Sequence, residues 1–241
     1  MNAVNRELKL GRAARGQALV ATLSGILPLA GCYFTPTEQE RLEQSVVVTA
    51  RDPAADLASY QSYFIRPEIR VLDEQDGLPT VSNTELLPEA AAAPLLNSTE
   101  ANLSARGYVA ASSSEEAELA VELVYVRSVD SDFYCANWGD WAYWGYPGWS
   151  YYFPYPCGTS AWYTGMLVTH VVDLAAARAA RAAQPDTLGM LRGVWLSGVY
   201  GAEVESASFQ ISRAAEGIDE AFAQSPYFVR TPAPASDTTV Q

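Results

Sequence analysis

The residues with the clearest chemistry in this sequence form the run Leu29-Ala30-Gly31-Cys32, which has the pattern of a lipobox. An apolar segment, residues 18–29, leads into it, preceded by four basic residues: Arg6, Lys9, Arg12 and Arg15. A cationic start, a short apolar segment and small residues before a cysteine are typical of an export signal whose cleavage exposes that cysteine for lipidation. We therefore expect residues 1–31 to be a lipoprotein signal peptide and Cys32 to carry the lipid.

Two alternatives to lipidation concern the same residues. Residues 18–29 could form an uncleaved transmembrane anchor, although a bilayer core needs roughly 20 apolar residues and this segment is shorter and contains Pro28. Cys32 could instead be buried or disulfide-bonded. The residue after Cys32 is Tyr33 and not Asp, so by resemblance to Gram-negative lipoproteins we expect an outer-membrane anchor with the folded part facing the periplasm.

The other two cysteines, Cys135 and Cys157, flank most of an aromatic segment. An exported chain meets an oxidising compartment, so we expect them to form a disulfide, which would stabilise the fold by roughly 3 kcal/mol. A metal site is the alternative, but two cysteines without a nearby histidine fall short of a tetrahedral ligand set. No motif predicts a metal or another cofactor.

Catalysis is not expected from the residue types available. The single histidine, His170, lies inside an apolar segment typical of a strand, and we expect it to be structural rather than a base for a Ser or Cys nucleophile. A carboxylate pair for glycoside hydrolysis remains a lesser alternative. Its candidate members are Asp130, Asp132, Asp140 and Asp173.

Residues 133–163 contain 14 of the 27 aromatic residues of the chain, separated by glycines and prolines. Each packed aromatic side chain buries about 150–250 Å², so this loop either covers something or is itself covered. Three interpretations are open: a lid over the sheet, a docking surface for a protein or membrane, or a stacking platform for sugars such as peptidoglycan. The candidate binding residues are Trp138, Trp141, Trp144, Trp149, Tyr151, Tyr152 and Trp162.

Charge argues against one class of partner. The whole chain has a net charge of −13, and removal of residues 1–31 takes away four cations and one anion, which leaves about −16. Phosphate backbones would repel such a surface. We expect no nucleic-acid partner, and a membrane attachment that depends on the lipid alone.

These residues must be positioned by a fold of modest size. Apolar alternation and β-branched content predict strands at residues 45–49, 59–66, 118–127, 163–174 and 191–200, the third with one face buried. Helices are expected from Pro94 to a cap at Gly107, at 175–184 as a short exposed helix, and at 211–222. Residues 68–89 are expected to be a long surface loop, residues 32–44 a tether, and residues 229–241 a disordered tail.

The chain also resembles the bacterial envelope lipoprotein family known as domain of unknown function 4136, over residues 52–228. The resemblance rests on these residues in this order: Asp56, Tyr60, Tyr63, Phe64, Ala105-Arg106-Gly107-Tyr108, Ala117-Glu118-Leu119-Ala120-Val121, Gly165-Met166-Leu167-Val168, Asp173, Val194-Trp195 and Pro226. It implies no activity and no site residues. We therefore expect one α+β domain, residues 45–228, with an antiparallel sheet of about four strands, two helices on one face and a long aromatic loop. The expected role is that of a non-catalytic structural or interaction protein of the envelope. A glycan- or peptidoglycan-binding module that uses the aromatic loop is the alternative.

Overall fold

The computed structural model describes residues 46–72, 74–75, 78–79, 85–129, 140–153, 163–201 and 208–230. All of them belong to one compact unit, Pro36–Gln241. None of the described helices combines the length and apolar character needed to cross a bilayer. The expected signal peptide, tether and disulfide lie outside the described residues, as do Cys32, Trp138 and Trp162.

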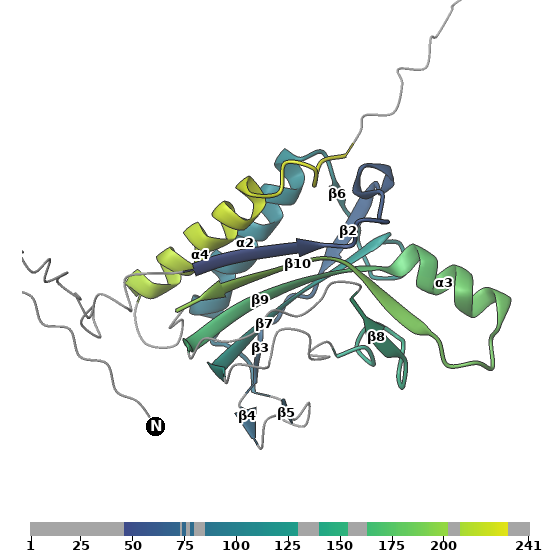
Figure 1. Cartoon of the computed structure of the whole chain (residues 1–241), viewed down its shortest axis with the longest axis horizontal. Coiled ribbons are helices and arrows are strands. Elements are labelled where there is room, and N and C mark those ends of the chain that lie inside the picture. The colour runs from purple at the N-terminus through teal and green to yellow at the C-terminus, as the bar shows by residue number, and fades with distance from the viewer. Residues whose placement is uncertain are drawn as a thin grey trace, which may run out of the picture. The chain divides into compact units, whose positions relative to one another are not determined.

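The centre of the fold is a mixed sheet of eight strands (Figure 1). Its main path runs β1 (Val46–Arg51), β10 (Met190–Tyr200), β9 (Tyr163–Asp173), β7 (Leu119–Val129), β2 (Ser62–Ile65) and β6 (Val109–Ala110). Strand β3 (Arg70–Leu72) also pairs with β7, and β8 (Ser150–Tyr152) pairs with β10. Pairs among β1, β10, β9 and β7 are antiparallel, whereas β2, β3, β6 and β8 join in parallel.

The expectation of about four antiparallel strands was therefore an undercount. The missed strands have only two or three residues each, too few to show alternation in the sequence. A separate two-stranded hairpin, β4 (Glu74–Gln75) with β5 (Leu78–Pro79), was also missed. Residues 68–89, expected to be a surface loop, contain β3 and the buried Ile69, Val71 and Leu87, so that expectation was wrong.

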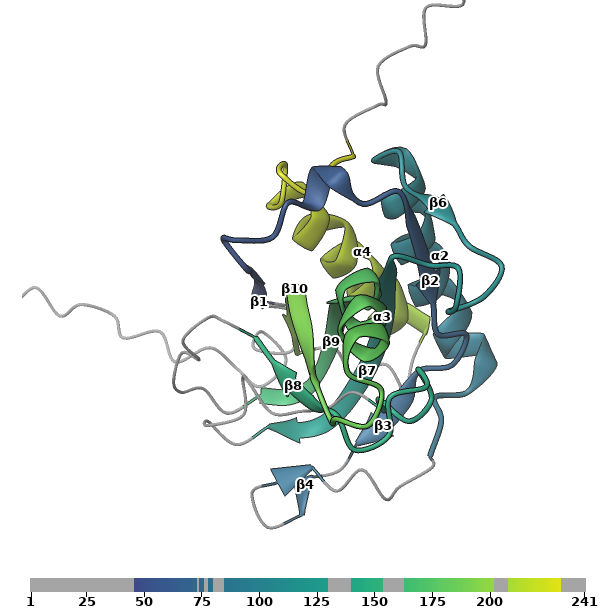
Figure 2. The ribbon, with the colours of Figure 1, turned by 90° about the vertical axis from the view of Figure 1, so that its right-hand side faces the viewer.

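Two helices cover one face of the sheet, as expected: α2 (Glu89–Ala105) and α4 (Ser208–Ala223) (Figure 1). Helix α2 begins five residues before Pro94. The four alanines at residues 90–93 are strong helix formers, and their helix propensity helps to offset the loss of the one backbone hydrogen bond that the proline cannot make. A third helix, α3 (Leu174–Ala183), joins β9 to β10 at one end of the sheet (Figures 1 and 2). The Asp173 carboxylate caps it by accepting a hydrogen bond from the Ala176 N–H at 2.8 Å. A short 3-10 turn, η1 (Leu57–Ser59), follows β1.

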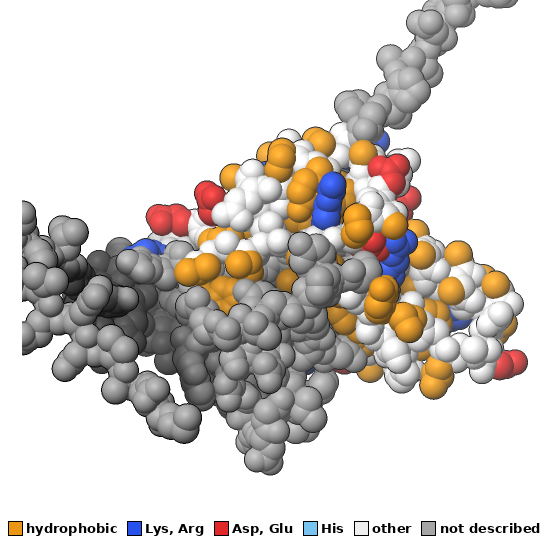
Figure 3. Space-filling view, viewed as in Figure 1, with side chains coloured by type: hydrophobic (Ala, Val, Ile, Leu, Met, Phe, Trp, Pro, Cys, Tyr) orange, Lys and Arg blue, Asp and Glu red, His pale blue; other side chains and the backbone are white. Residues whose placement is uncertain are grey.

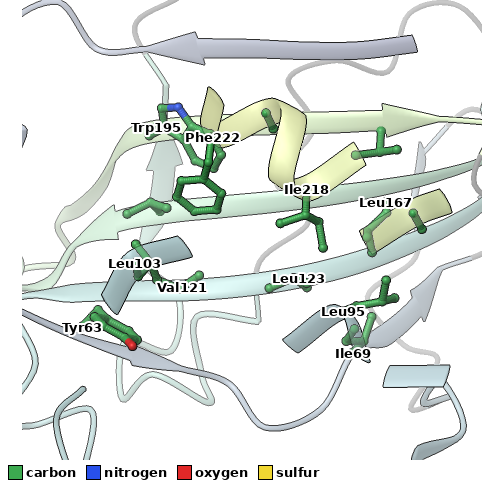
Figure 4. Packing of buried hydrophobic residues seen from close by; sticks show 14 of the residues in the cluster. Tyr63, Ile69, Leu95, Leu103, Val121, Leu123, Leu167, Trp195, Ile218 and Phe222 are labelled. Atoms are coloured by element: carbon green, nitrogen blue, oxygen red, sulfur yellow. The ribbon is translucent and has the colours of Figure 1, made fainter. Parts of the chain in front are cut away.

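The main hydrophobic core lies between the sheet and the helices α2 and α4 (Figure 4). Strand residues such as Leu123 and Leu167 meet Leu95 of α2 and Ile218 of α4 there. Trp195 of β10 stacks on Phe222 of α4, with ring centroids 5.0 Å apart. This layer contains most of the buried hydrophobic side chains that stabilise the fold. Acidic side chains are seen on the outer side of the helices (Figure 3).

The opposite face of the sheet is buried as well, which corrects the expectation that β7 has only one buried face. Ala120, Glu122 and Val124 of β7 are as inaccessible as their neighbours Leu119, Val121 and Leu123. Two further clusters cover this second face, one around Val124 and Val168, the other around Trp141 and Trp144. The described part of the aromatic loop therefore packs against the second face of the sheet.

Candidate functional site

The described part of the aromatic loop, residues 140–153, lies over the second face of the sheet; we call it the aromatic lid. It makes a turn at residues 141–145 and then pairs as β8 with β10. Gly145 and Gly148 have positive φ angles of 82° and 75°, a conformation that glycine adopts without strain. These turns direct the aromatic side chains of the lid toward the sheet.

Four of the large side chains of the lid are buried. Trp141, Trp144, Tyr146 and Trp149 expose only 4–6% of their surface. They pack with Ala120 of β7, Val172 of β9, Ala177 of α3 and Leu191 of β10. Two aromatic contacts tie the lid together: Trp141 stacks on Tyr151 at 5.1 Å, and Tyr146 meets Trp149 edge-on at 4.8 Å.

Two glycines of β10 and its preceding turn let the lid approach closely. A Cβ atom at Gly189 would lie 2.6 Å from the Trp149 ring, and one at Gly193 would lie 2.7 Å from the Phe153 ring. Real Cβ contacts are not that short, so any side chain at either position would push the lid outward. The fit between β10 and the lid therefore depends on these glycines.

A buried carboxylate, Glu122 of β7, fixes the lid from below. Its side chain is 1% exposed and accepts a hydrogen bond from the Trp144 indole N–H at 3.2 Å. The backbone N–H of Asp140, at the start of the lid, donates to the same carboxylate at 3.3 Å. Glu122 also contacts two buried arginines, Arg66 at 3.2 Å and Arg70 at 3.1 Å. Glu122 of β7 thus links the lid to the stretch of chain at residues 66–70.

Arg66 extends this network to the surface. Its guanidinium contacts the Asp140 carboxylate at 3.2 Å and Glu68 at 3.4 Å. It also lies 4.1 Å from the centroid of the Tyr143 ring, a favourable cation–π geometry. Buried charges in proteins are paired because an unpaired one is very costly. The cluster of Arg66, Arg70, Glu122 and Asp140 satisfies this requirement, and we call it the lid anchor.

His170 of β9 lies beside the lid anchor, directly opposite Glu122 in the strand register. It is buried, and its Nδ1 lies 3.2 Å from the Tyr151 hydroxyl of the lid. Burial, with a smaller contribution from Arg70, lowers the pKa of His170 to about 3. The imidazole is therefore neutral near pH 7 and contacts the lid, an environment that favours the structural role expected from the sequence.

The carboxylates considered for hydrolysis belong to separate networks where the structure describes them. Asp140 pairs with Arg66, whereas Asp173 caps α3 and accepts a hydrogen bond from the Tyr60 hydroxyl at 2.6 Å. Burial and the Asp173 carboxylate raise the pKa of Tyr60. Asp130 and Asp132 lie outside the described residues. The described members thus hold the fold together at two different places.

The candidate binding residues that the structure describes differ in their exposure to solvent. Trp141, Trp144 and Trp149 are buried, Tyr151 is half-buried, and Tyr152 is exposed. For residues 140–153, this burial agrees with the interpretation of the loop as a lid over the sheet. The importance of Arg66, Arg70 and Glu122 was not predicted from the sequence. One indication was available: Glu122 lies two residues from Ala120 and two from Val124, so it shares a face of the strand with apolar side chains, which is typical of a buried polar group.

Comparison with known proteins places the chain in a family. A crystal structure of a DUF4136 family protein from Bacteroides thetaiotaomicron is similar, with 26% identity and a TM-score of 0.55, covering 78% of this chain and 98% of that one. A PelC dodecamer structure from Paraburkholderia phytofirmans has 13% identity and a TM-score of 0.34, covering 78% of this chain and 100% of that one. A PDZ domain protein from Parabacteroides distasonis has 14% identity and a TM-score of 0.37, covering 79% of this chain and 37% of that one.

No curated protein matches the sequence. The family model described as a domain of unknown function, DUF4136, matches residues 47–227. That range extends from the first strand to beyond the last helix. The chain belongs to the DUF4136 family.

Proposed function

We propose that the protein is a lipid-anchored envelope protein, attached through Cys32 to the outer membrane, that acts by contact with another envelope protein and not by catalysis. The observation that carries the proposal is the lipobox that ends at Cys32, 14 residues before the first described strand residue, Val46. A multiply acylated cysteine holds a protein on a bilayer stably. The DUF4136 domain would then work close to that surface.

The environment of the polar groups supports a non-catalytic role. Glu122 and His170, the chemically most versatile buried groups beneath the lid, both contact lid residues. General acid–base catalysis needs a group within hydrogen-bond reach of a substrate. Here the large side chains of the lid fill the space above these groups.

The surface proposed for the partner is apolar and lies beside the lid. Leu188 is 69% exposed, Met190 57% and Tyr152 49%. Met190 pairs in register with Ser150 of β8, so these side chains come from neighbouring segments; we call them the β8–β10 edge patch. Apolar side chains also gather at the α3 end of the molecule (Figure 3). Exposed apolar side chains that come together from neighbouring segments are typical of interaction sites.

The anchor is tested by replacing the cysteine. We expect Cys32→Ser to move the protein from the membrane fraction to the soluble fraction, because removal of the thiol removes the acyl chains. Mass spectrometry of the wild-type protein should show an acylated N-terminal Cys32. The variants Cys135→Ser and Cys157→Ser are the controls and should stay in the membrane fraction. An unmodified full-length N-terminus in natively expressed protein would disprove the anchor.

The contact role is tested by crosslinking in intact cells. We expect the double variant Leu188→Ser/Met190→Ser to reduce the yield of a recurring crosslinked envelope protein by at least about tenfold, since each large apolar side chain contributes about 1.5–3 kcal/mol when buried. The control is Val109→Ser at β6, the other end of the main strand path, where Val109 is 59% exposed. Equal crosslinking in both variants would rule out the β8–β10 edge patch as the contact surface.

A further inference from the structure

We propose that a hollow between α3 and the aromatic lid binds a small oxyanion, a carboxylate or phosphate group held by Arg178 and Arg181. The hollow has a volume of about 190 Å³. Its lining comes from three segments: Ser114 and Glu115 before β7, Trp144, Gly145 and Tyr146 of the lid, and the two arginines of α3. We call it the α3–lid hollow. This proposal is independent of the lipid anchor and of the β8–β10 edge patch.

The two arginines are already held in place. They are three residues apart on α3, which puts them on the same side of the helix. Arg178 donates to the backbone carbonyls of Ala117 at 2.6 Å and Ser114 at 3.3 Å. Arg181 donates to the Gly145 carbonyl at 2.7 Å and lies 3.9 Å from the Tyr146 ring centroid. A ligand would therefore not bear the full entropy cost of ordering these side chains.

Their positive charges are not neutralised by a carboxylate. Among the described residues, no carboxylate lies within ion-pair distance of Arg178 or Arg181. A guanidinium has five N–H donors, and carbonyl bonds use at most two in each of these arginines. The remaining donors fit the two-oxygen geometry of a carboxylate or phosphate.

One anionic group of the protein shares the hollow. Glu115 lines the hollow and is exposed, and hydrogen bonding from Ser113, with a smaller contribution from Arg178, lowers its pKa. Glu115 does not approach either arginine within ion-pair distance. Its negative charge should weaken the binding of an anion without preventing it. Removal of this charge should therefore raise the affinity for an anion, whereas removal of an arginine should lower it.

The size of the hollow limits the ligand class. A volume of about 190 Å³ is below the 300–1,000 Å³ typical of pockets for drug-sized ligands. It suits a single anionic group, free or at the end of a larger molecule. The aromatic side chains Trp144 and Tyr146 add an apolar wall on one side.

The test is titration of the purified full chain with inorganic phosphate, followed by calorimetry and by tryptophan emission. We expect saturable binding, weakened at least about tenfold in Arg181→Gln because a charge-assisted contact is lost. Arg51→Gln removes the same charge from β1 and should bind as the wild type does. Near-ultraviolet circular dichroism checks that the lid is intact in each variant.

A second pair of variants keeps the test independent of folding. Glu115→Gln should tighten phosphate binding several-fold, whereas Glu216→Gln on α4 should not change it. Galacturonate in place of phosphate distinguishes a carboxylate from a phosphate site, and binding of either supports an oxyanion site. Absence of saturable binding of both, equal affinities of Arg181→Gln and Arg51→Gln, or no tightening by Glu115→Gln would overturn the proposal.

Discussion

Glu122→Ala should destabilise the protein by about 3–5 kcal/mol, the usual cost of removing one partner from a buried ion pair. The substitution takes away the carboxylate that contacts both Arg66 and Arg70. It also leaves the Trp144 indole N–H without the acceptor that holds it. Urea unfolding should show a lower midpoint, and tryptophan emission should shift to the red as the lid loosens.

The control for this variant is an exposed ion pair of the same type. Glu85 pairs with Arg127, and its side chain is 50% exposed. Exposed pairs contribute little to stability, so Glu85→Gln should leave the midpoint almost unchanged. Glu122→Gln should fall between the two, because it keeps a hydrogen-bond acceptor for Trp144 but loses the charge. Equal midpoints for Glu122→Ala and Glu85→Gln would mean that the lid anchor does not hold the lid.

The long elements of the fold could be predicted from the sequence because each has either a regular spacing of apolar residues or a composition that favours one secondary structure. Strand β7 alternates side chains over eleven residues, and α4 places Ile211, Ala215, Ile218 and Phe222 on one side. The parallel strands β3, β6 and β8, with two or three residues each, could not be predicted. Arg70–Leu72 becomes a strand because β7 offers it free backbone groups, which is a tertiary effect and not a local one.

The lid anchor could be predicted only in part. Glu122 stands out in an apolar strand, but the sequence does not show whether the second face of that strand meets water or protein. The partners of Glu122 are distant in the chain: Arg66 comes 56 residues earlier, and Trp144 comes 22 residues later. Loop composition predicted that the aromatic residues would be covered or would cover something. Which surface they cover depends on the close approach permitted by Gly189 and Gly193.

The two faces of the sheet are stabilised in different ways. The helix-covered face is held by apolar packing, with Trp195 among its largest fully buried side chains. A bulge in β10 between Gly193 and Trp195 shifts the register, so that Val194 and Trp195 both reach this core. The lid-covered face depends on aromatic contacts and on one buried ion cluster. The two layers can therefore be perturbed separately.

Trp195→Ala should remove about 3–5 kcal/mol of stability, the usual range for truncating a buried tryptophan. Its ring lies 5.0 Å from Phe222 and 5.3 Å from Phe228, so the variant leaves a cavity between β10 and α4. Its indole N–H donates to Ser225 Oγ at 2.9 Å. Urea unfolding followed by far-ultraviolet circular dichroism measures the loss.

Trp195→Phe separates packing from the hydrogen bond. This variant keeps an aromatic ring against Phe222, and it should cost clearly less than Trp195→Ala because most of the buried area remains. Tyr227 still contacts the Ser225 hydroxyl at 3.2 Å, which limits the penalty for the lost N–H. If Trp195→Ala and Glu122→Ala act on separate layers, their effects on the free energy of unfolding should add. Marked non-additivity would show instead that the lid and the helices are coupled through the sheet.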